Sequence, residues 1–491
     1  MKRLTFLLIV FSLLLNPIGA QTPLAKKAAG AVFTLKTFDK DGQLLASSNG
    51  LFVSEQGEAL SSYTPFKGAQ RAVIIDAQGK EWPVECIIGV NDLYDVAKFK
   101  VDIKKAVALT VSSDQSSQGA TVWLLPYSVK KAPKLEKGTV SSAETFQEKY
   151  AYYTLDMPYN ELHVGCPVLN DNGQVVGILQ PAAGSKTTAS YAVSAPFAQD
   201  MQMTGISLND PALRATAIDK AVPDDLQQAM LAMLIGGSVM DSQQYNSFVD
   251  RFIRKFPQSA DGYITRARQY AAAGRYADAD QDMQQALKVA DNKADAYYQY
   301  AQLIYQKVTQ QPEPAYESWT QEQALKQMDQ AVASFSQPYT QEAAPYLLAR
   351  AQMLHEMGKY RLAVNDYNEY EKLMAGQVKA PFYYTRHQAE VSGHLYQQAL
   401  NDISRAIELA PKKPLYYAEK ASLELRVGMR DEAEKTAQEC INVAPDLSDG
   451  YLFLGIAQCL KGNKTEGVKN MQKAQELGND QAPALIEKYG K

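Results

Sequence analysis

Histidine and cysteine are scarce in this chain of 491 residues, which holds four of each. Only one histidine, His163, lies among the first 200 residues. The four cysteines do not have metal-ligand spacing with histidine, so the sequence predicts no metal site, and it predicts no cofactor. We expect the four cysteines, Cys86, Cys166, Cys440 and Cys459, to be buried free thiols.

An excess of charge of one sign is also missing. The net charge is -4, and charged residues make up 21% of the chain. Because a nucleic-acid-binding protein needs a basic patch or stripe, this balance predicts no nucleic-acid partner. Beyond the N-terminal segment no stretch is apolar enough to span a bilayer of roughly 30 Å, so we expect no transmembrane helix in the mature chain.

The N-terminal residues "MKRLTFLLIVFSLLLNPIGA" have the pattern of a secretory signal peptide. Lys2 and Arg3 precede an almost wholly apolar run, Phe6 to Leu15, which is too short to cross a membrane. Small residues follow at Gly19 and Ala20. We predict that residues 1–20 are removed after Ala20 and that the mature protein is periplasmic or secreted.

The periodicity of the chain changes near its middle. Residues 21–200 contain short runs rich in Val, Ile, Leu and aromatics, such as "RAVIIDA" and "TVWLLPY", separated by turn residues, which predicts an all-β domain. Residues 225–491 show helical spacing of apolar residues and a fixed period, seen in Ala399, Ala433 and Gly467 at intervals of 34 residues. We interpret residues 201–224 as the connection.

The periodic half resembles tetratricopeptide repeats. "LYYAEKASLELRVGMRDEAEKTAQECINVAPD" aligns with "DGYLFLGIAQCLKGNKTEGVKNMQKAQELGND", with small residues where paired helices would approach closely. We count six clear units after a weaker one that ends at Pro257. The segment "VTQQPEPAYESW" is predicted to be a loop within one unit, and "APALIEKYGK" a C-terminal capping helix.

The β half resembles the trypsin-like serine proteases, especially the bacterial periplasmic heat-shock type. The resemblance is carried by "SNGLFVSEQGEALSSYTPFKGA", "GVNDLYDVAKFKVD", "KGTVSSA", "LDMPYNELHVGCPVLNDNGQVVGIL" and "ASYAVSAP", in the family's order. It implies a double β-barrel over roughly residues 28 to 200. The expected fold is therefore a trypsin-like double β-barrel followed by an all-α tetratricopeptide-repeat solenoid.

The same resemblance assigns the catalytic positions. The histidine position falls on Thr64, the acid on Asp95, and the nucleophile on Val164. Acyl transfer of this type needs a hydroxyl and an imidazole to accept its proton. Leu162 and Cys166 also replace the glycines on either side of the nucleophile position, which disturbs the oxyanion turn. The resemblance therefore implies a protease homologue that has lost its activity.

An alternative is a peptidase with a displaced site, in which Cys166 attacks with the help of His163 or Asp95. Nucleophile and base must lie within hydrogen-bond reach, and residues three apart on one loop rarely meet this condition. We prefer a buried Cys166 and an exposed His163 on a turn.

The predicted function is that of an exported, non-catalytic binding or scaffold protein. Stacked repeats form an extended concave surface that suits a protein or an extended peptide. Most repeat tyrosines are expected to pack between helices. Tyr298 and Tyr384 are predicted to contact a partner. A purely structural envelope component is a further alternative, and the sequence leaves the partner, the oligomeric state and the binding face open.

Overall fold

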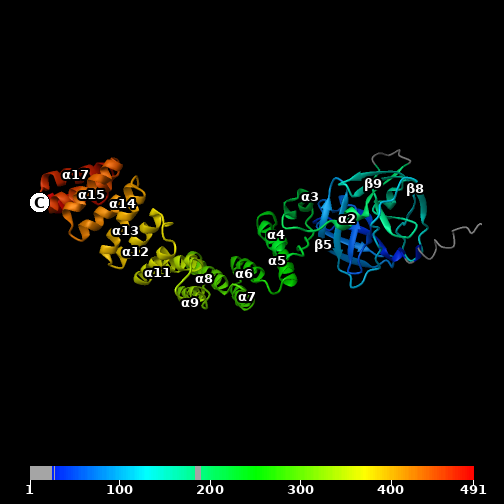
Figure 1. The fold of residues 1–491 in the computed structure, drawn as a ribbon, viewed down its shortest axis with the longest axis horizontal. Helices are drawn as coiled ribbons and strands as arrows, with labels where there is room; N and C mark the ends of the chain where they lie inside the picture. Colours follow the sequence, from blue (N-terminus) through cyan, green and yellow to red (C-terminus); the bar gives the residue numbers. More distant parts are fainter. Residues whose placement is uncertain (1–24, 27, 183–188, 491) are drawn as a thin grey trace, which may run out of the picture. The chain divides into compact units, whose positions relative to one another are not determined.

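The computed structural model describes residues 25, 26, 28–182 and 189–490. It divides into two compact units, Met1–Arg266 and Ala267–Lys491. The predicted signal peptide, residues 1–20, lies outside the described residues. Two β-barrels come first in the chain and helical repeats follow, as the sequence predicts (Figure 1).

Six antiparallel strands close the first barrel in the order β1-β2-β3-β6-β5-β4. Alternation along β1 sends Phe33 and Leu35 into the barrel, where both are fully buried. The ring of Phe33 lies 4.9 Å from that of Phe52, so aromatic packing fills this core. The strands are β1 (Val32–Phe38), β2 (Leu44–Phe52), β3 (Glu58–Ser61), β4 (Arg71–Ile75), β5 (Glu81–Asn91) and β6 (Val96–Val101).

The second barrel is closed by six strands in the order β10-β11-β12-β9-β8-β7. β11 is buried along its whole length, which explains why its sequence is a continuous apolar run. The strands are β7 (Thr121–Leu124), β8 (Glu136–Phe146), β9 (Tyr150–Asp156), β10 (Pro167–Leu169), β11 (Val175–Leu179) and β12 (Ser190–Ser194).

The segment 201–224, which the sequence marks as a connection, packs on the first barrel. The backbone of Ile87 in β5 donates to the carbonyl of Asp219 and accepts from Ala221, both at 2.8 Å. Leu213 and Ile218 are buried in the core that contains Phe99. The segment is therefore part of the first unit's hydrophobic core. The adjoining helices are α2 (Ala195–Asp200), α3 (Pro211–Arg214), α4 (Leu226–Val239) and α5 (Ser242–Lys255).

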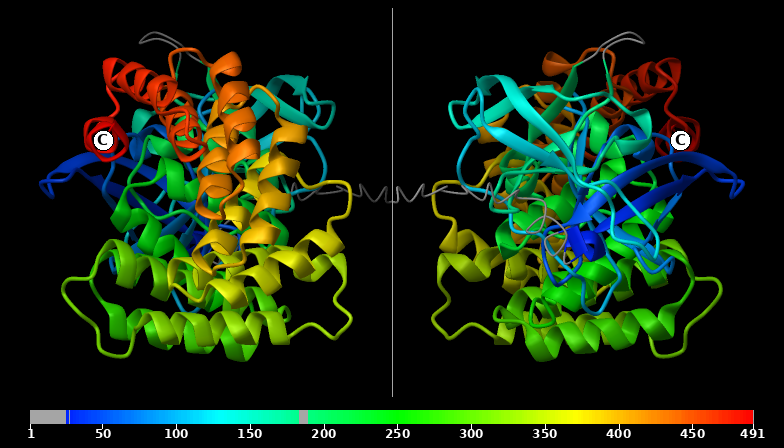
Figure 2. Two further views of the ribbon diagram at one scale, coloured as in Figure 1. Left: turned by 90° about the vertical axis from the view of Figure 1, so that its left-hand side faces the viewer. Right: turned by 90° about the vertical axis from the view of Figure 1, so that its right-hand side faces the viewer.

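From residue 260 onward the described chain is built of helix pairs joined by short turns. The orange and red helices of the last repeats lie side by side in Figure 2. Several turns use a glycine with positive φ, such as Gly428 at 85°, where other residues would be strained. The helices are α6 (Ala260–Ala272), α7 (Tyr276–Val289), α8 (Lys293–Gln310), α9 (Gln321–Ala333), α10 (Ala344–Glu356), α11 (Tyr360–Leu373), α12 (Ala380–Ser392), α13 (Tyr396–Leu409), α14 (Pro414–Arg426), α15 (Arg430–Val443), α16 (Ser448–Leu460), α17 (Lys464–Glu476) and α18 (Ala482–Gly490).

The periodic small residues lie where the two helices of a unit meet. Ala399 on α13 and Ala433 on α15 are fully buried. A Cβ atom added to Gly467 on α17 would lie 2.3 Å from the sulfur of Cys459 and 2.7 Å from the carbonyl oxygen of Gly455 on α16. Only glycine permits this approach. The 34-residue period therefore arises because each helix pair needs a small residue at the same point, where its two helices come closest.

The segment between α8 and α9 is a loop that is fixed to the repeats at both ends. The predicted loop began at Val308, but α8 continues to Gln310, so the first three residues of the prediction are helical. The buried Lys307 ammonium donates to the carbonyls of Pro312 at 2.9 Å and Pro314 at 2.8 Å. The indole nitrogen of Trp319 donates to Asp280 on α7 at 2.8 Å. These bonds satisfy polar groups that burial would otherwise leave unpaired.

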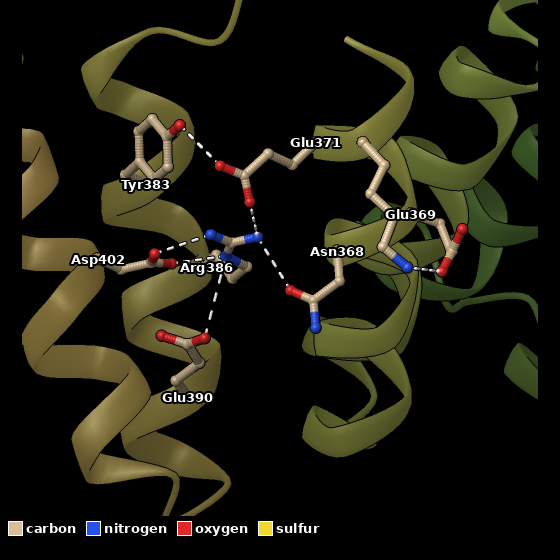
Figure 3. Close-up of polar contacts among 8 residues, drawn as sticks. Asn368, Glu369, Glu371, Tyr383, Arg386, Glu390 and Asp402 are labelled. Carbon is tan, nitrogen blue, oxygen red and sulfur yellow. Dashed lines mark hydrogen bonds and ion pairs between the residues drawn. The ribbon is translucent and has the colours of Figure 1, made fainter. Parts of the chain in front are cut away.

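A buried charge network joins α11, α12 and α13 (Figure 3). The Arg386 guanidinium, 6% exposed, donates two hydrogen bonds to Asp402, at 2.6 and 2.8 Å. It also donates to Glu371 at 2.6 Å and to Asn368 at 2.9 Å. Glu390 lies 3.9 Å away and is 3% exposed. One cation therefore faces three carboxyl groups in a largely buried site.

Glu390 is expected to make the stability of the repeats depend on pH. Burial, and next the charge of Asp402, raise the pKa of its carboxyl to about 8. In the unfolded chain this carboxyl releases its proton near pH 4.5. The stability that the protonated Glu390 contributes is therefore fully present below that pH, and it is lost as the pH rises through about 8. Glu390→Gln should remove this loss and raise the free energy of unfolding at pH 9 by at least about 1 kcal/mol. Denaturant unfolding at pH 4, 7 and 9 measures the effect, and a variant with the wild-type pH slope would contradict it.

Candidate functional site

Thr64 and Asp95 are brought into contact at the end of the first barrel. Thr64 begins the short 3-10 helix η2 (Thr64–Phe66), and its backbone N–H donates to the Asp95 carboxylate at 2.6 Å. The N–H of Tyr63 donates to the Asp95 carbonyl at 3.2 Å. Burial raises the pKa of Asp95, and bonds from Thr64 oppose this shift. The carboxylate therefore orients a loop, and threonine offers no group that can accept a proton at neutral pH.

Val164, which the sequence predicts to occupy the nucleophile position, follows a second 3-10 helix, η3 (Glu161–His163). In the trypsin-like arrangement the oxyanion is bound by the N–H of the nucleophile residue and the N–H two residues before it. Here the N–H of Leu162 donates to the Asn160 side chain at 3.0 Å. The N–H of Val164 donates to the carbonyl of Glu161 at 3.2 Å. Both N–H groups are therefore engaged in hydrogen bonds within the loop.

Asn49, a residue that the sequence analysis does not single out, holds this loop against the first barrel. Its side-chain amide donates to the carbonyls of Leu162 at 2.8 Å and Val164 at 3.0 Å, and its backbone N–H donates to Val164 at 3.1 Å. The Asn49 carbonyl accepts from Ser61, three residues before Thr64, at 2.5 Å. Asn49 thus ties the Val164 loop to the segment that precedes Thr64. The sequence analysis missed Asn49 because the motifs it compares are short and local, whereas this contact joins residues more than 100 positions apart.

Cys166 and His163 lie on one turn but are not arranged as nucleophile and base. Cys166 is fully buried, and burial raises the pKa of its thiol to about 12. His163 is half-buried rather than exposed as predicted, and its Nδ1 lies 3.6 Å from Glu136 and its Nε2 3.4 Å from the amide of Asn160. The two residues are joined through the backbone, where the N–H of Cys166 donates to the carbonyl of His163 at 3.0 Å. A buried, protonated thiol is a poor nucleophile.

Within the described ranges, no group of His, Cys, Asp or Glu side chains has an arrangement suited to a metal ion. All four cysteines are buried free thiols. The part of the chain that the structure covers also has no helix that is both long and apolar enough to cross a membrane.

Tyr298 and Tyr384, the predicted partner-contacting residues, are half-buried between consecutive repeats. The ring of Tyr298 on α8 lies 5.7 Å from that of Tyr346 on α10. The ring of Tyr384 on α12 lies 5.2 Å from that of Tyr416 on α14, and its hydroxyl donates to Glu419 at 3.5 Å. Both rings stabilise the stacking of repeats. A contact between either tyrosine and a partner stays a prediction.

Residues 48–178, from β2 to β11, match the family model described as "Trypsin-like peptidase domain". This range contains the three positions Thr64, Asp95 and Val164. The first unit carries a trypsin-like peptidase domain. A crystal structure of the Rv3671c protease from M. tuberculosis in its active form is also similar, with 15% identity and a TM-score of 0.32, covering 38% of this chain and 85% of that one.

Two curated relatives match the chain by sequence. They are the small glutamine-rich tetratricopeptide repeat-containing protein 2 of Saccharomyces cerevisiae, 28% identical over 93 residues, and that of Mycosarcoma maydis, 30% identical over 82 residues. These matches cover 19% and 17% of this chain, and the chain spans only 27% and 23% of the relatives' own lengths. Together with the helix pairs these matches support tetratricopeptide repeats in the helical region.

Proposed function

We propose that this chain is an exported scaffold protein in which the trypsin-like domain does not cleave peptides and the repeats bind a protein or peptide partner. Repeat solenoids present long surfaces that suit such partners. Localisation to the periplasm or the extracellular space is inferred from the N-terminal pattern of Lys2, Arg3 and the apolar run that follows.

The absence of peptidase activity is inferred chiefly from the loop at Val164. Valine has no nucleophilic atom, and the N–H groups of Leu162 and Val164 already donate to Asn160 and Glu161. Removal of one oxyanion donor costs about 100- to 1,000-fold in rate. A domain without nucleophile, base or free oxyanion donors can bind a polypeptide but has no means of forming an acyl-enzyme.

The purified mature chain is expected to show no peptidase turnover above buffer with a mixed fluorogenic peptide library, and no labelling by a fluorophosphonate probe. The reason is the missing serine and imidazole at Val164 and Thr64. Cys166→Ala serves as the matched control, since it removes the displaced nucleophile of the alternative mechanism. If wild type showed turnover and Cys166→Ala did not, the result would contradict the proposal and support a cysteine peptidase.

Export and binding are tested in cells. N-terminal sequencing of the fractionated mature protein is expected to begin at Gln21. In-cell cross-linking through photoreactive residues placed on the repeat helices should give one or a few defined adducts. A protein that stays in the cytoplasm with its first residues intact would contradict export, and a diffuse smear of adducts would contradict a specific scaffold.

A further inference from the structure

The connection between α9 and α10, residues 334–343, is longer than the connections between the later helix pairs. The helices α13 and α14, for example, are joined by residues 410–413. Gln337, Pro338 and Tyr339 of the long connection line a pocket of about 540 Å³. Insertions in repeat proteins gather on one face, which is often the face that binds a ligand. The pocket is therefore a candidate binding site.

The rest of the pocket is formed mainly by α11, the second helix of the next pair, which contributes Asn365 and Asn368. Of the lining residues only Arg350 lies on a first helix, α10. The pocket is thus built by a second helix and a connection, and it differs from the surface that the first helices of the repeats form.

The uncharged polar side chains of the pocket have hydrogen-bonding groups to spare. The Asn368 carbonyl accepts from Arg386 at 2.9 Å, and its amide nitrogen points away from that bond (Figure 3). Asn365 is exposed, and within the described residues its amide has no side-chain hydrogen bond. The Gln337 amide donates to the Tyr339 hydroxyl at 3.2 Å, which leaves that hydroxyl its own proton to donate. The pocket therefore offers donors and acceptors side by side.

The charged side chains of the pocket are already paired with one another. Arg350 donates to both carboxylate oxygens of Asp366, at 2.7 and 2.8 Å. Lys372 donates to Glu369 at 2.6 Å. A charged ligand would have to break one of these pairs and leave a side chain without its counterion, whereas an uncharged ligand would not. The electrostatics of the pocket therefore favour an uncharged, hydrophilic ligand.

A sugar matches the remaining groups. Each sugar hydroxyl both donates and accepts, as the amides and the tyrosine hydroxyl of the pocket do. The rings of Pro338 and Tyr339 offer apolar surface to the C–H face of a pyranose. Tyr339 packs on a buried cluster that contains Val332 and Leu347, which holds its ring at the pocket. The volume lies within the range of small-molecule sites, roughly 300–1,000 Å³.

We propose that this pocket binds a neutral mono- or disaccharide through Tyr339, Asn365 and Asn368. The sugar hydroxyls would replace water on these three side chains, and no ion pair would be broken. The inference goes beyond the proposed scaffold function and does not depend on it, because both the ligand and the place of binding are different.

The test uses the full mature chain and three β-1,4-linked disaccharides, titrated in saturation-transfer difference NMR at about pH 6. Cellobiose and N,N′-diacetylchitobiose are uncharged, and at least one of them is expected to bind. Chitobiose has the same ring skeleton but carries ammonium groups at this pH. It should bind at least about 5-fold more weakly than the better neutral sugar, since the pocket has no unpaired carboxylate to receive it.

Tyr339→Phe/Asn365→Ala should weaken binding of the neutral sugar about 10-fold, as expected for two lost hydrogen bonds. Phenylalanine keeps the ring that packs on the buried cluster, and Asn365 is exposed, so the fold should be retained. Asn365→Trp gives a second test from the exposed position alone, because the indole fills the pocket and should abolish binding. Denaturant unfolding of both variants should match wild type.

The matched control is Gln438→Ala/Asn442→Ala on α15. These two side chains lie at the positions of a later repeat that correspond to Asn368 and Lys372 on α11, and they bond each other at 3.2 Å. No long connection precedes that repeat, so this variant should bind the sugar within about 2-fold of wild type.

Three results would each overturn the inference. They are no binding of either neutral disaccharide by wild type, binding of chitobiose as tight as that of the neutral sugars, and unchanged binding by correctly folded Tyr339→Phe/Asn365→Ala and Asn365→Trp. The scaffold function is judged separately by in-cell cross-linking, which does not depend on sugar binding.

Discussion

Arg386→Met is expected to destabilise the repeat region by about 3–5 kcal/mol, because it leaves buried carboxylates without their cation. Arg386 bonds Asp402 and Glu371 at 2.6 Å and joins three helices from two successive repeats. Denaturant unfolding followed by circular dichroism measures the change in the free energy of unfolding. The loss should be larger at pH 8 than at pH 5, since Glu390 becomes charged as the pH rises.

The matched control is Arg405→Met in the same repeat. Arg405 is 51% exposed in its side chain and pairs with Glu408 at 2.7 Å. Solvent screens exposed pairs of this kind, and they contribute little to stability, so this variant should unfold nearly as wild type does. If both variants lost the same small amount, the buried network would not be what joins α11 to α13.

Gly165→Ala is expected to destabilise the trypsin-like domain by about 3 kcal/mol, from a clash and an unfavourable backbone conformation together. Gly165 has a φ of 85°, and an added Cβ would lie 2.1 Å from the carbonyl oxygen of Asn49. That oxygen belongs to the backbone of β2 and already accepts from Ser61, so it cannot move freely. Thermal unfolding by near-UV circular dichroism, which reports tertiary packing of the barrels, measures the loss.

Gly119→Ala separates the two causes. Gly119 has a φ of 84°, and its added Cβ would meet no atom within 4 Å. The substitution therefore carries the backbone cost alone, about 1 kcal/mol. The difference between the two alanine variants reports the contact between the Val164 loop and Asn49, and equal losses would show that this contact is not tight.

The repeats are the part of the fold that local sequence predicts best. Ala399, Ala433 and Gly467 recur because each marks a close contact within its own helix pair, and such contacts lie close in sequence. The described chain contains six helix pairs from α6 to α17, a loop after α8 that begins three residues later than predicted, and a last helix, α18. The Arg386 network was not predicted. Its members come from three helices, and no property of an isolated arginine or glutamate indicates burial.

The strands of the barrels are also predicted from local sequence, although their pairing joins residues that are farther apart in the chain. Alternation and turn residues predict the strands, and the order of family-like segments predicts two barrels. The packing of residues 201–224 on β5 could not be predicted, because the segment lacks a period and its contacts are with Ile87, more than 100 residues earlier.

The sequence alone determined which chemical groups stand at the predicted catalytic positions, since side-chain identity at Thr64, Asp95 and Val164 does not depend on folding. Only the tertiary structure decided what surrounds them. The engagement of the Leu162 and Val164 N–H groups, the role of Asn49 and the burial of Cys166 each depend on distances between atoms that the linear order does not fix.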